Sequence, residues 1–439
     1  MSVFSSLRKF GKVFSQIDVS ETIDALGKLN QTELYQIMKI IKSKGKVYQP
    51  PEIDGDYYHL SRFLTPEERE IQLKVREFMN EHVKPIANDC WNKAHFPMEL
   101  IPKMAELNIA GLTYEGYDSP MGSYLLEGFI TMEMARVDTS ISTFFGVQSG
   151  LAMGSIYFCG SEEQKWKWLP AMQRMEKIGA FGLTEPNVGS AVAGGLETTC
   201  KRDGDSWILN GQKKWIGNAT FADLTIIWAR DLDDNQVKGF IVEKGTKGFK
   251  AEKQEDKMAL RTVQNALITL TNCEISEENR LQECNSFKDT SKVLKATRAG
   301  VAWQAVGCAR GAYECALEYS TQRYQFGKPI ASFQLVQDLL VQMLTDLTAI
   351  QSMAFHLSKL QDEGTMTDQQ ASLAKVACTK HTREIVGHAR EIFGGNGILL
   401  EHNIARFVAD AEALYTYEGT KEVNSLIVGR DITGISAFV

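Results

Sequence analysis

The stretch LYTYEGT at residues 414–420 places one carboxylate, Glu418, between an aromatic residue and a glycine. Apolar residues follow at Val423, Leu426 and Ile427, and their spacing predicts a helix directly after a loop. A lone acid before a helix is most often only a partner of the positive end of the helix dipole. If the loop borders a water-poor pocket, however, burial raises the pKa of the Glu418 carboxyl and makes it a usable general base.

Composition limits the kinds of protein to consider. The chain has 439 residues, of which 44% are hydrophobic, so it can bury a large core. The length predicts two or three domains or one long fold. A net charge of −7 gives no indication of a nucleic-acid surface. No apolar run approaches the ~18 residues that a membrane span needs, so no transmembrane segment is expected.

Cysteine and histidine usage favours a protein without disulfides or a metal site. The 8 cysteines are scattered and form no CxxC pair, which predicts reduced, buried thiols of an intracellular protein. His381 and His388 are seven residues apart and have no carboxylate pair at metal-ligand spacing. No metal is therefore expected.

The two ends of the chain bear on its location. Residues 1–15 resemble a weak transit peptide, but they fit an amphipathic helix better, because helical periodicity continues through residues 21–42. The last four residues, SAFV, are not a peroxisomal signal. The sequence indicates the cytoplasm if the protein is bacterial, with the mitochondrial matrix as the less favoured alternative.

The order of patterns along the chain predicts an α+β fold. Residues 1–55 are expected to be a helical extension and residues 56–177 a helical domain, with a strong helix start at Thr65–Glu68. Residues 178–285 contain β-branched runs and the turn signal Asn210-Gly211, which predict a middle domain of mostly antiparallel strands. Residues 286–439 return to helices and are expected to form a C-terminal four-helix bundle.

Two motifs of the predicted middle domain could bind a cofactor. The loop FGLTEPNVGS at residues 181–190 offers amides and hydroxyls to a heteroaromatic ring or a phosphate, and is alternatively an ordinary turn. In KWIGN at residues 214–218, the tryptophan could pack against a planar cofactor or belong to the hydrophobic core.

Two further motifs lie among the later helices. RYQFGKP at residues 323–329 suits a pyrophosphate or a plain helix end. GGNG at residues 394–397 lacks the lysine of a P-loop and the position of a Rossmann loop after a strand. No Gly-x-Ser-x-Gly occurs, so a hydrolase has no support.

Taken together, these motifs resemble the acyl-CoA dehydrogenase family from about residue 56 to the end of the chain. The resemblance is carried by LTEP at 183–186, Trp215-Ile216, Arg323 with QFG at 325–327, GGNG at 394–397 and YEGT at 417–420. Within the family, the sequence resembles glutaryl-CoA dehydrogenases and plant peroxisomal short-chain acyl-CoA oxidases. Residues 289–294, 301–304 and 432–435 fit that branch.

The resemblance implies one FAD per subunit of a homotetramer. Residues implied to line the flavin and its linker are Phe181, Leu183, Thr184, Gly189, Ser190, Trp215, Ile216 and Gly217. Residues implied to reach the FAD of a neighbouring subunit are Arg323, Phe326, Gln334, Glu391, Ile392, Gly394 and Gly395. Thr420 and Phe438 would complete the pocket.

The resemblance also implies a reaction. Glu418 would remove the α-proton of an acyl-CoA while the β-hydrogen leaves as hydride to flavin N5, which gives a trans-2-enoyl-CoA. The Glu418 amide and a ribityl hydroxyl would hold the thioester carbonyl. Implied substrate contacts are Ser142, Thr143, Ser190, Arg298, Tyr417 and Gly419. Some members of the family carry the catalytic base at the position directly before the one that Arg298 occupies here. That position is Thr297 in this chain, so Glu418 is the expected base. Electron transfer flavoprotein would accept the electrons.

Two departures from the family pattern refine these expectations. Glutaryl-CoA dehydrogenases have an arginine where this chain has Ser142, and no cation occurs at residues 139–145. A buried carboxylate without a partner is costly, so we expect an uncharged acyl chain and no decarboxylation. Phe144 and Phe145 would favour short or branched chains.

Gly217 stands where dehydrogenases usually have threonine and matches the oxidases, so a short-chain acyl-CoA oxidase that uses O2 is the alternative. A silent acyl-CoA- or FAD-binding scaffold is a third possibility.

Overall fold

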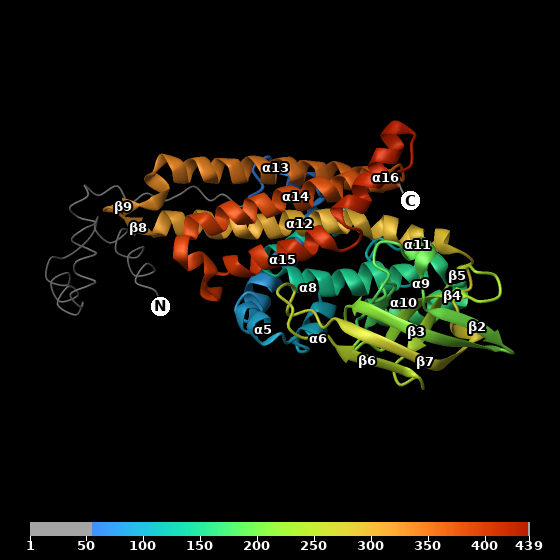
Figure 1. The fold of residues 1–439 in the computed structure, drawn as a ribbon. Coiled ribbons are helices and arrows are strands. Elements are labelled where there is room, and N and C mark those ends of the chain that lie inside the picture. The colour runs from blue at the N-terminus through green and yellow to red at the C-terminus, as the bar shows by residue number, and fades with distance from the viewer. Residues whose placement is uncertain (1–54, 438–439) are drawn as a thin grey trace. The chain divides into compact units, whose positions relative to one another are not determined.

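The computed structural model describes residues 55–437. The predicted α+β fold is confirmed: helices come first, strands follow, and helices return (Figure 1). The chain divides into two units, one of which comprises residues 53–323 and 330–439. The hairpin of β8 (Tyr324–Gln325) and β9 (Lys328–Pro329) belongs to the other unit. The predicted extension before residue 55 and Phe438 lie outside the described residues.

The first helices begin where the sequence predicted. The Thr65 hydroxyl accepts the Glu68 amide at 3.2 Å, the Glu68 carboxylate accepts the Thr65 amide at 3.0 Å, and Pro66 occupies the first turn. The helices of this part are α4 (Pro66–Phe78), α5 (Ala87–Lys93), α6 (Leu100–Ala105), α7 (Tyr124–Val137), α8 (Thr139–Phe145), α9 (Met153–Cys159) and α10 (Glu162–Gln173). A wider helical turn, Gly146–Ala152, joins α8 to α9.

The middle of the chain forms one seven-stranded sheet. Its strands are β1 (Gly179–Gly182), β2 (Thr199–Asp203), β3 (Ser206–Ile216), β4 (Leu224–Asp231), β5 (Val237–Glu243), β6 (Phe249–Lys253) and β7 (Ala266–Ser276), and a short helix, α11 (Val192–Gly195), precedes β2. They pair in the order β1-β4-β2-β3-β7-β6, and β5 also pairs with β4. The pairings of β4 with β1 and β2 are parallel and the others are antiparallel.

The predicted hairpin turn at Asn210-Gly211 is wrong. Both residues lie inside β3, where the register against β7 shifts between Leu209 and Gly211. Gly211 has φ 142°, and a Cβ there would approach the Thr198 Cα to 2.6 Å. Glycine is therefore needed for a β-bulge and a close strand contact rather than for a turn.

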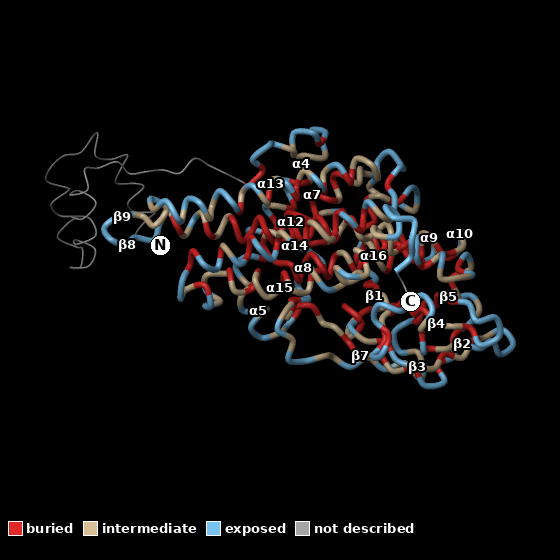
Figure 2. The backbone as a smooth tube through the Cα atoms, turned by 45° about the horizontal axis from the view of Figure 1, so that its top comes forward, coloured by how far each residue is buried: buried red, intermediate tan, exposed pale blue. Residues whose placement is uncertain are grey.

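Five α-helices follow the sheet in the part of the chain up to residue 437, and residues from them line one side of the site. They are α12 (Phe287–Gln322), α13 (Gln334–Asp362), α14 (Asp368–Phe393), α15 (Ile404–Thr416) and α16 (Lys421–Thr433). Buried residues run along α7, α8, α12 and α14 (Figure 2). Small residues let α7 and α12 approach closely: a Cβ on Gly307 would come within 2.4 Å of the Met132 carbonyl oxygen.

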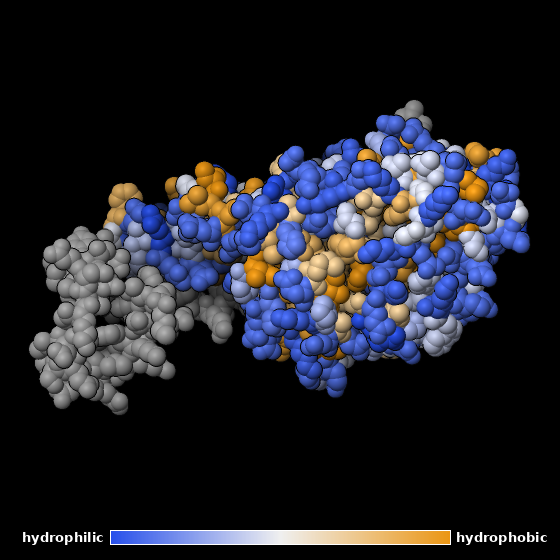
Figure 3. Space-filling view, turned by 90° about the horizontal axis from the view of Figure 1, so that it is seen from below, coloured by the Kyte–Doolittle hydropathy of each residue, from blue (hydrophilic) through white to orange (hydrophobic). Residues whose placement is uncertain are grey.

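The outer surface and the thiols agree with the composition. Polar side chains cover most of the face seen in Figure 3, and apolar side chains gather between them. All eight cysteines are free, and all but Cys315 are buried, as predicted. In the part of the chain from residue 55 to 437, no helix combines the length and apolar character required to traverse a bilayer.

Candidate active site

Segments from all three parts of the chain line one cavity of about 1300 Å³. The predicted site residues on its wall are Thr143, Phe181, Leu183, Thr184, Gly189, Ser190, Trp215, Ile216, Gly217, Arg298, Tyr417, Glu418, Gly419 and Thr420. They come from the first helices, the sheet with its loops, and the C-terminal helices. The fold therefore brings together residues that are more than 270 positions apart in the sequence.

Glu418 lies on the loop between α15 and α16. It has φ 52° and Gly419 has φ 86°, so two successive left-handed residues turn the chain sharply before α16. A non-glycine residue is uncommon in this region, and such strain often occurs at functional sites. The turn directs the half-buried Glu418 side chain toward α12, where the Thr297 hydroxyl donates a hydrogen bond of 2.9 Å to its carboxylate.

The electrostatic surroundings of Glu418 leave it with a raised pKa. Burial raises the pKa of the carboxyl, and the Thr297 hydroxyl and the charges of Arg298 and Lys375 oppose that shift without cancelling it. A carboxylate with a raised pKa that faces a cavity is suited to accept a proton from a bound molecule.

Lys375 fixes the loop that carries Glu418. Its ammonium is fully buried and donates to the Tyr415 carbonyl at 3.0 Å and to the Gly419 carbonyl at 2.7 Å. These two carbonyls flank Glu418 on both sides. Burial lowers the pKa of Lys375 to about 8, and the Glu418 charge acts against that shift. The sequence reading missed this residue, because a lysine inside a helical pattern has no motif of its own.

The aromatic neighbour of Glu418 is also fixed by polar contacts. The Tyr417 hydroxyl donates to the Gln304 side-chain oxygen and lies 3.4 Å from the Thr143 hydroxyl oxygen. Thr143 itself donates to the Thr139 carbonyl at 2.8 Å. Tyr417 thus links the Glu418 loop to α12 and α8.

The end of β3 presents a flat aromatic wall to the cavity. Trp215 has φ 67° and remains 54% exposed, although the strand around it is well fixed. Its amide donates to the Gln254 side chain at 2.9 Å, and its carbonyl accepts from Asn265 at 3.1 Å. An exposed tryptophan on a rigid strand end beside a large cavity is suited to stack against a planar ligand.

The LTEP loop is held by a buried ion pair. Lys213 donates to the Glu185 carboxylate at 2.7 Å and to the Leu183 carbonyl at 3.0 Å. The amides of Glu197 and Thr198 donate to the same carboxylate at 2.6 and 2.8 Å. Burial raises the pKa of Glu185, but these partners outweigh it and lower the pKa overall. Glu185 therefore positions the loop, whose Leu183 and Thr184 line the cavity.

Several predicted residues do not lie on this cavity. Ser142 is buried, and its hydroxyl donates to the Thr131 carbonyl at 3.3 Å, so the expected substrate contact is not on the wall. The residues Arg323, Phe326, Gln334, Glu391, Ile392, Gly394 and Gly395 do not line it either. They are implied to reach the FAD of a neighbouring subunit, and that role stays a prediction.

Within residues 55–437, one group of side chains has metal-like spacing. The Nδ1 atom of His381 lies 3.5 Å from an Asp346 oxygen and 3.2 Å from a Glu384 oxygen. Sequence spacing could not show this group, because Asp346 is on α13 and the other two are on α14. All three are partly or fully exposed, and acidic groups of this kind are common without a metal, so we assign it no function.

Comparison with known proteins identifies the family. The description "Acyl-CoA dehydrogenase" applies to all three matching models: the N-terminal domain at residues 65–176, the middle domain at 180–273 and the C-terminal domain at 287–433. The chain belongs to the acyl-CoA dehydrogenase family. It is thus an oxidoreductase, and the family uses FAD.

Named relatives show the range of activities in this family. The chain is 33% identical over 378 residues to a 3-(aryl)acrylate reductase of Clostridium sporogenes, which covers 84% of this chain and 99% of that protein. It is 32% identical over 358 residues to the mitochondrial short-chain specific acyl-CoA dehydrogenase of Rattus norvegicus, with 80% and 87% covered.

Solved structures resemble the whole fold. A glutaryl-CoA dehydrogenase from Mycobacterium smegmatis in complex with FADH2 matches with a TM-score of 0.85 and 34% identity, covering 88% of this chain and 99% of that one. A chain of a structure described as an electron transferring flavoprotein of Acidaminococcus fermentans matches with a TM-score of 0.81 and 32% identity, covering 84% and 98%.

The cavity residues fit an FAD. The Trp215 ring offers an exposed apolar face, and a Cβ added to Gly189 would meet no atom within 4 Å, so a ligand can approach the backbone of that loop. Thr184, Ser190 and Thr420 add hydroxyls on the same wall. A flat face with nearby hydroxyls and an accessible loop suits a ring system joined to a polar linker.

Proposed function

We propose that the protein catalyses the flavin-dependent α,β-dehydrogenation of a short-chain, uncharged acyl-CoA to the trans-2-enoyl-CoA. The observation that carries this proposal is the Glu418 carboxylate, whose pKa is raised and which lies on the same cavity wall as Trp215. Glu418 would take the α-proton of the substrate. FAD, when bound, supplies the acceptor for the β-hydride.

The surrounding residues support this arrangement of the substrate. Arg298 and Ser190 line the cavity and would contact the CoA portion, and Arg298 is oriented by an ion pair with Asp368. The Glu418 amide would donate to the thioester carbonyl, where negative charge develops as the α-proton leaves. Thr143, Tyr417 and Gly419 would border the acyl group.

The segment at residues 139–145 supports an uncharged and short acyl chain. It is buried throughout and contains no cation that could pair with a distal carboxylate. Phe145 lines the cavity and reduces the room for a long chain, whereas Phe144 is fully buried and packs against Phe96 and Phe221. Glutaryl-CoA dehydrogenation is the less favoured alternative, although a glutaryl-CoA dehydrogenase is similar in fold.

Anaerobic bleaching of the bound flavin tests the proposal. We expect butyryl-, isobutyryl- or hexanoyl-CoA to bleach the flavin of the purified holoenzyme, and glutaryl-CoA to leave it oxidised. Bleaching by glutaryl-CoA would refute the argument from Ser142. A flavin that none of the four thioesters reduces would instead support a binding scaffold.

The electron acceptor is proposed to be electron transferring flavoprotein, with O2 as the alternative. The alternative rests on Gly217: a Cβ there would meet Val147 at 3.4 Å and Val263 at 3.6 Å, which are ordinary contacts. A side chain therefore fits at this position, and its absence leaves room that O2 could occupy. For an oxidase we expect Gly217→Thr to slow reoxidation of the reduced flavin by air. Unchanged oxygen reactivity would remove this argument.

We also propose a homotetramer in the bacterial cytoplasm, with the mitochondrial matrix as the alternative compartment. Exposed apolar residues on α13 support association, since Leu335 is 81% and Val341 62% exposed on the single chain. Relatives occur in a bacterium and in mitochondria. Light scattering on the purified holoenzyme would measure the oligomer, and a monomeric mass would contradict it.

A further inference from the structure

Glu127 is a second acid on the wall of the active-site cavity. It lies in the first turn of α7, is only partly buried, and lines the same cavity as Glu418. Among residues 55–437 its carboxylate has neither a hydrogen bond nor an ion pair. An acid in the first turn of a helix interacts favourably with the helix dipole, but that role requires no contact with a cavity.

The surroundings of Glu127 form a polar arm of the cavity. Residues of three helices on this part of the cavity lining are here called the arm: Tyr124, Glu127 and Gly128 of α7, Gly300 and Trp303 of α12, and Ser358 and Gln361 of α13. The Trp303 indole donates to the Ser358 hydroxyl at 2.9 Å, and a Cβ on Gly128 would come within 2.2 Å of the indole nitrogen. These contacts make the wall around Glu127 rigid.

The geometry of α12 indicates which end of a substrate the arm would receive. Thr297, which binds Glu418, marks the catalytic side of the helix. Gly300 lies about 60° to one side of Thr297 and Arg298 about 100° to the other, at about 100° per residue. A Cβ on Gly300 would meet nothing within 4 Å, so the cavity is open on that side. On α12, Gly300 and Arg298 thus lie on opposite sides of Thr297, and we place the CoA portion on the Arg298 side.

The charges around Glu127 define what the arm can accept. Burial and the nearby Asp362 carboxylate raise the pKa of Glu127 to about 7. Its other ionisable neighbours are the phenols of Tyr114 and Tyr124. Asp362 accepts the Tyr124 amide at 2.7 Å and remains in place beside the arm. A carboxylate in this arm would meet two acids, whereas a hydroxyl could donate to Glu127.

We infer that Glu127 is a specificity-determining residue, which binds a hydroxyl at the far end of the acyl group and rejects a carboxylate there. This inference rests on the proposed function and names the substrate class more closely: short, uncharged acyl-CoAs with a terminal hydroxyl. A carboxylate that is partly withdrawn from water and has no hydrogen-bond partner is unfavourable, and a donor on the substrate would reduce that cost on binding.

The test compares each ω-hydroxyacyl-CoA with its unsubstituted counterpart at chain lengths of four, five and six carbons. The readouts are kcat/KM from flavin bleaching and the dissociation constants of the matching enoyl-CoA products from the flavin absorbance shift. We expect the wild-type holoenzyme to prefer the hydroxyl at one length, and Glu127→Leu to lower that preference at least tenfold. The preference of each enzyme is the ratio of kcat/KM for the hydroxyl compound to that for its unsubstituted counterpart, so a general change in activity cancels.

Controls separate the two proposals. Glu115→Leu alters an exposed acid outside the arm and should keep the wild-type preference. A preference unchanged in Glu127→Leu overturns the inference, and faster reaction of an ω-aminoacyl-CoA than of the hydroxyl compound overturns the hydroxyl assignment. If neither butyryl-, isobutyryl- nor hexanoyl-CoA bleaches the flavin, the proposed function fails, while the product dissociation constants still decide the role of Glu127.

Discussion

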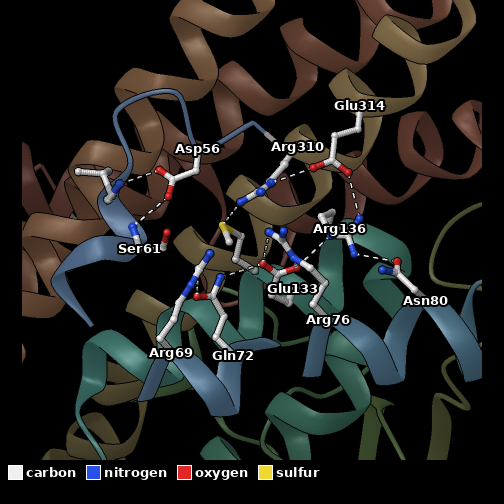
Figure 4. A network of polar contacts seen from close by, with 12 residues as sticks. Asp56, Ser61, Arg69, Gln72, Arg76, Asn80, Glu133, Arg136, Arg310 and Glu314 are labelled. Atoms are coloured by element: carbon white, nitrogen blue, oxygen red, sulfur yellow. Dashed lines mark hydrogen bonds and ion pairs between the residues drawn. The ribbon is translucent and has the colours of Figure 1, made fainter. Parts of the chain in front are cut away.

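Glu133 is fully buried and Glu418 is half-buried, and their surroundings shift the pKa values of the two acids in opposite directions. Glu133 lies on α7 and accepts hydrogen bonds from Gln72 at 2.9 Å, Arg76 at 2.8 Å and Arg136 at 3.0 Å (Figure 4). Glu418 accepts one hydrogen bond, from the Thr297 hydroxyl. The number of charged donors therefore decides which of the two acids can take part in proton transfer.

The pKa values follow from these partners. Burial raises the pKa of Glu133, but the nearby guanidinium groups of Arg310, Arg76 and Arg136 outweigh it and lower the pKa to about 2. At Glu418 burial prevails, and the pKa rises. The first acid remains charged at any physiological pH and holds α4 against α7. The second can exchange a proton with a ligand in the cavity.

The largest expected effect is on catalysis by a Glu418→Gln variant. Glutamine keeps the shape of the side chain and its contact with Thr297 but cannot take the α-proton. Because general bases contribute about 10²–10⁴-fold, we expect the rate of flavin bleaching by butyryl-CoA to fall by about 10³-fold or more. The absorbance shift on binding of crotonyl-CoA should remain.

Glu422→Gln, at an exposed acid in the next helix, is the matched control and should leave the rate unchanged. A Glu418→Gln enzyme that bleaches at more than a tenth of the wild-type rate would remove Glu418 as the base.

The second effect is on stability. Glu133→Gln removes the buried negative charge that pairs with Arg76 and Arg136, while Arg136 keeps its ion pair with Glu314. Breaking a buried ion pair typically costs about 3–5 kcal/mol of unfolding free energy. We expect a clearly lower midpoint of urea unfolding for the holoenzyme, while kcat per bound flavin stays close to wild type. A large loss of kcat with normal stability would contradict the structural role.

The pH dependence of stability should report the same difference. The folded pKa of Glu133, about 2, is below the unfolded value of about 4.3, so its contribution is fully present above about pH 4.3 and is lost as pH falls toward 2. That contribution is about 3 kcal/mol. When the urea midpoint of unfolding is plotted against pH, its fall toward acidic pH should be steeper for wild type than for Glu133→Gln.

The sequence could predict the Glu418 site better than the Glu133 network. Glu418, Trp215 and the LTEP loop are motifs with fixed local spacing, and the order of elements follows from hydrophobic periodicity. Glu133 depends on partners 57 and 61 residues before it and up to 177 after it, which no local pattern reveals. Asn210-Gly211 was misread because bulges and turns share the same residue types. Lys375 and Glu127 become functional candidates only once α14 and α7 are packed.

Lys375 tests how far a neighbouring charge sets the pKa of Glu418. In Lys375→Met the carbonyls of Tyr415 and Gly419 lose their common donor, and a positive charge near Glu418 disappears. We expect kcat to fall by about 10–100-fold, a loss of roughly 1.4–2.7 kcal/mol. The acid limb of the kcat/KM profile should move to higher pH, since the base must be unprotonated to react.

Lys380→Met alters an exposed lysine on the same helix and serves as the control. Lys375→Arg keeps the charge and should restore part of the pH profile. A profile that does not move in Lys375→Met would limit the residue to a packing role.

The smallest expected effect concerns the hydrogen bond that the Thr297 hydroxyl donates to the Glu418 carboxylate. Thr297→Val keeps the shape of the side chain but removes the hydroxyl that donates to the carboxylate at 2.9 Å. This hydroxyl lowers the pKa of Glu418, so its loss should raise that pKa further and move the acid limb of kcat/KM to higher pH. One such bond is worth about 1 kcal/mol, which predicts a five- to tenfold loss of rate near the limb and little loss at high pH. An equal loss at all pH values would mean that Thr297 orients Glu418 rather than tuning its proton affinity.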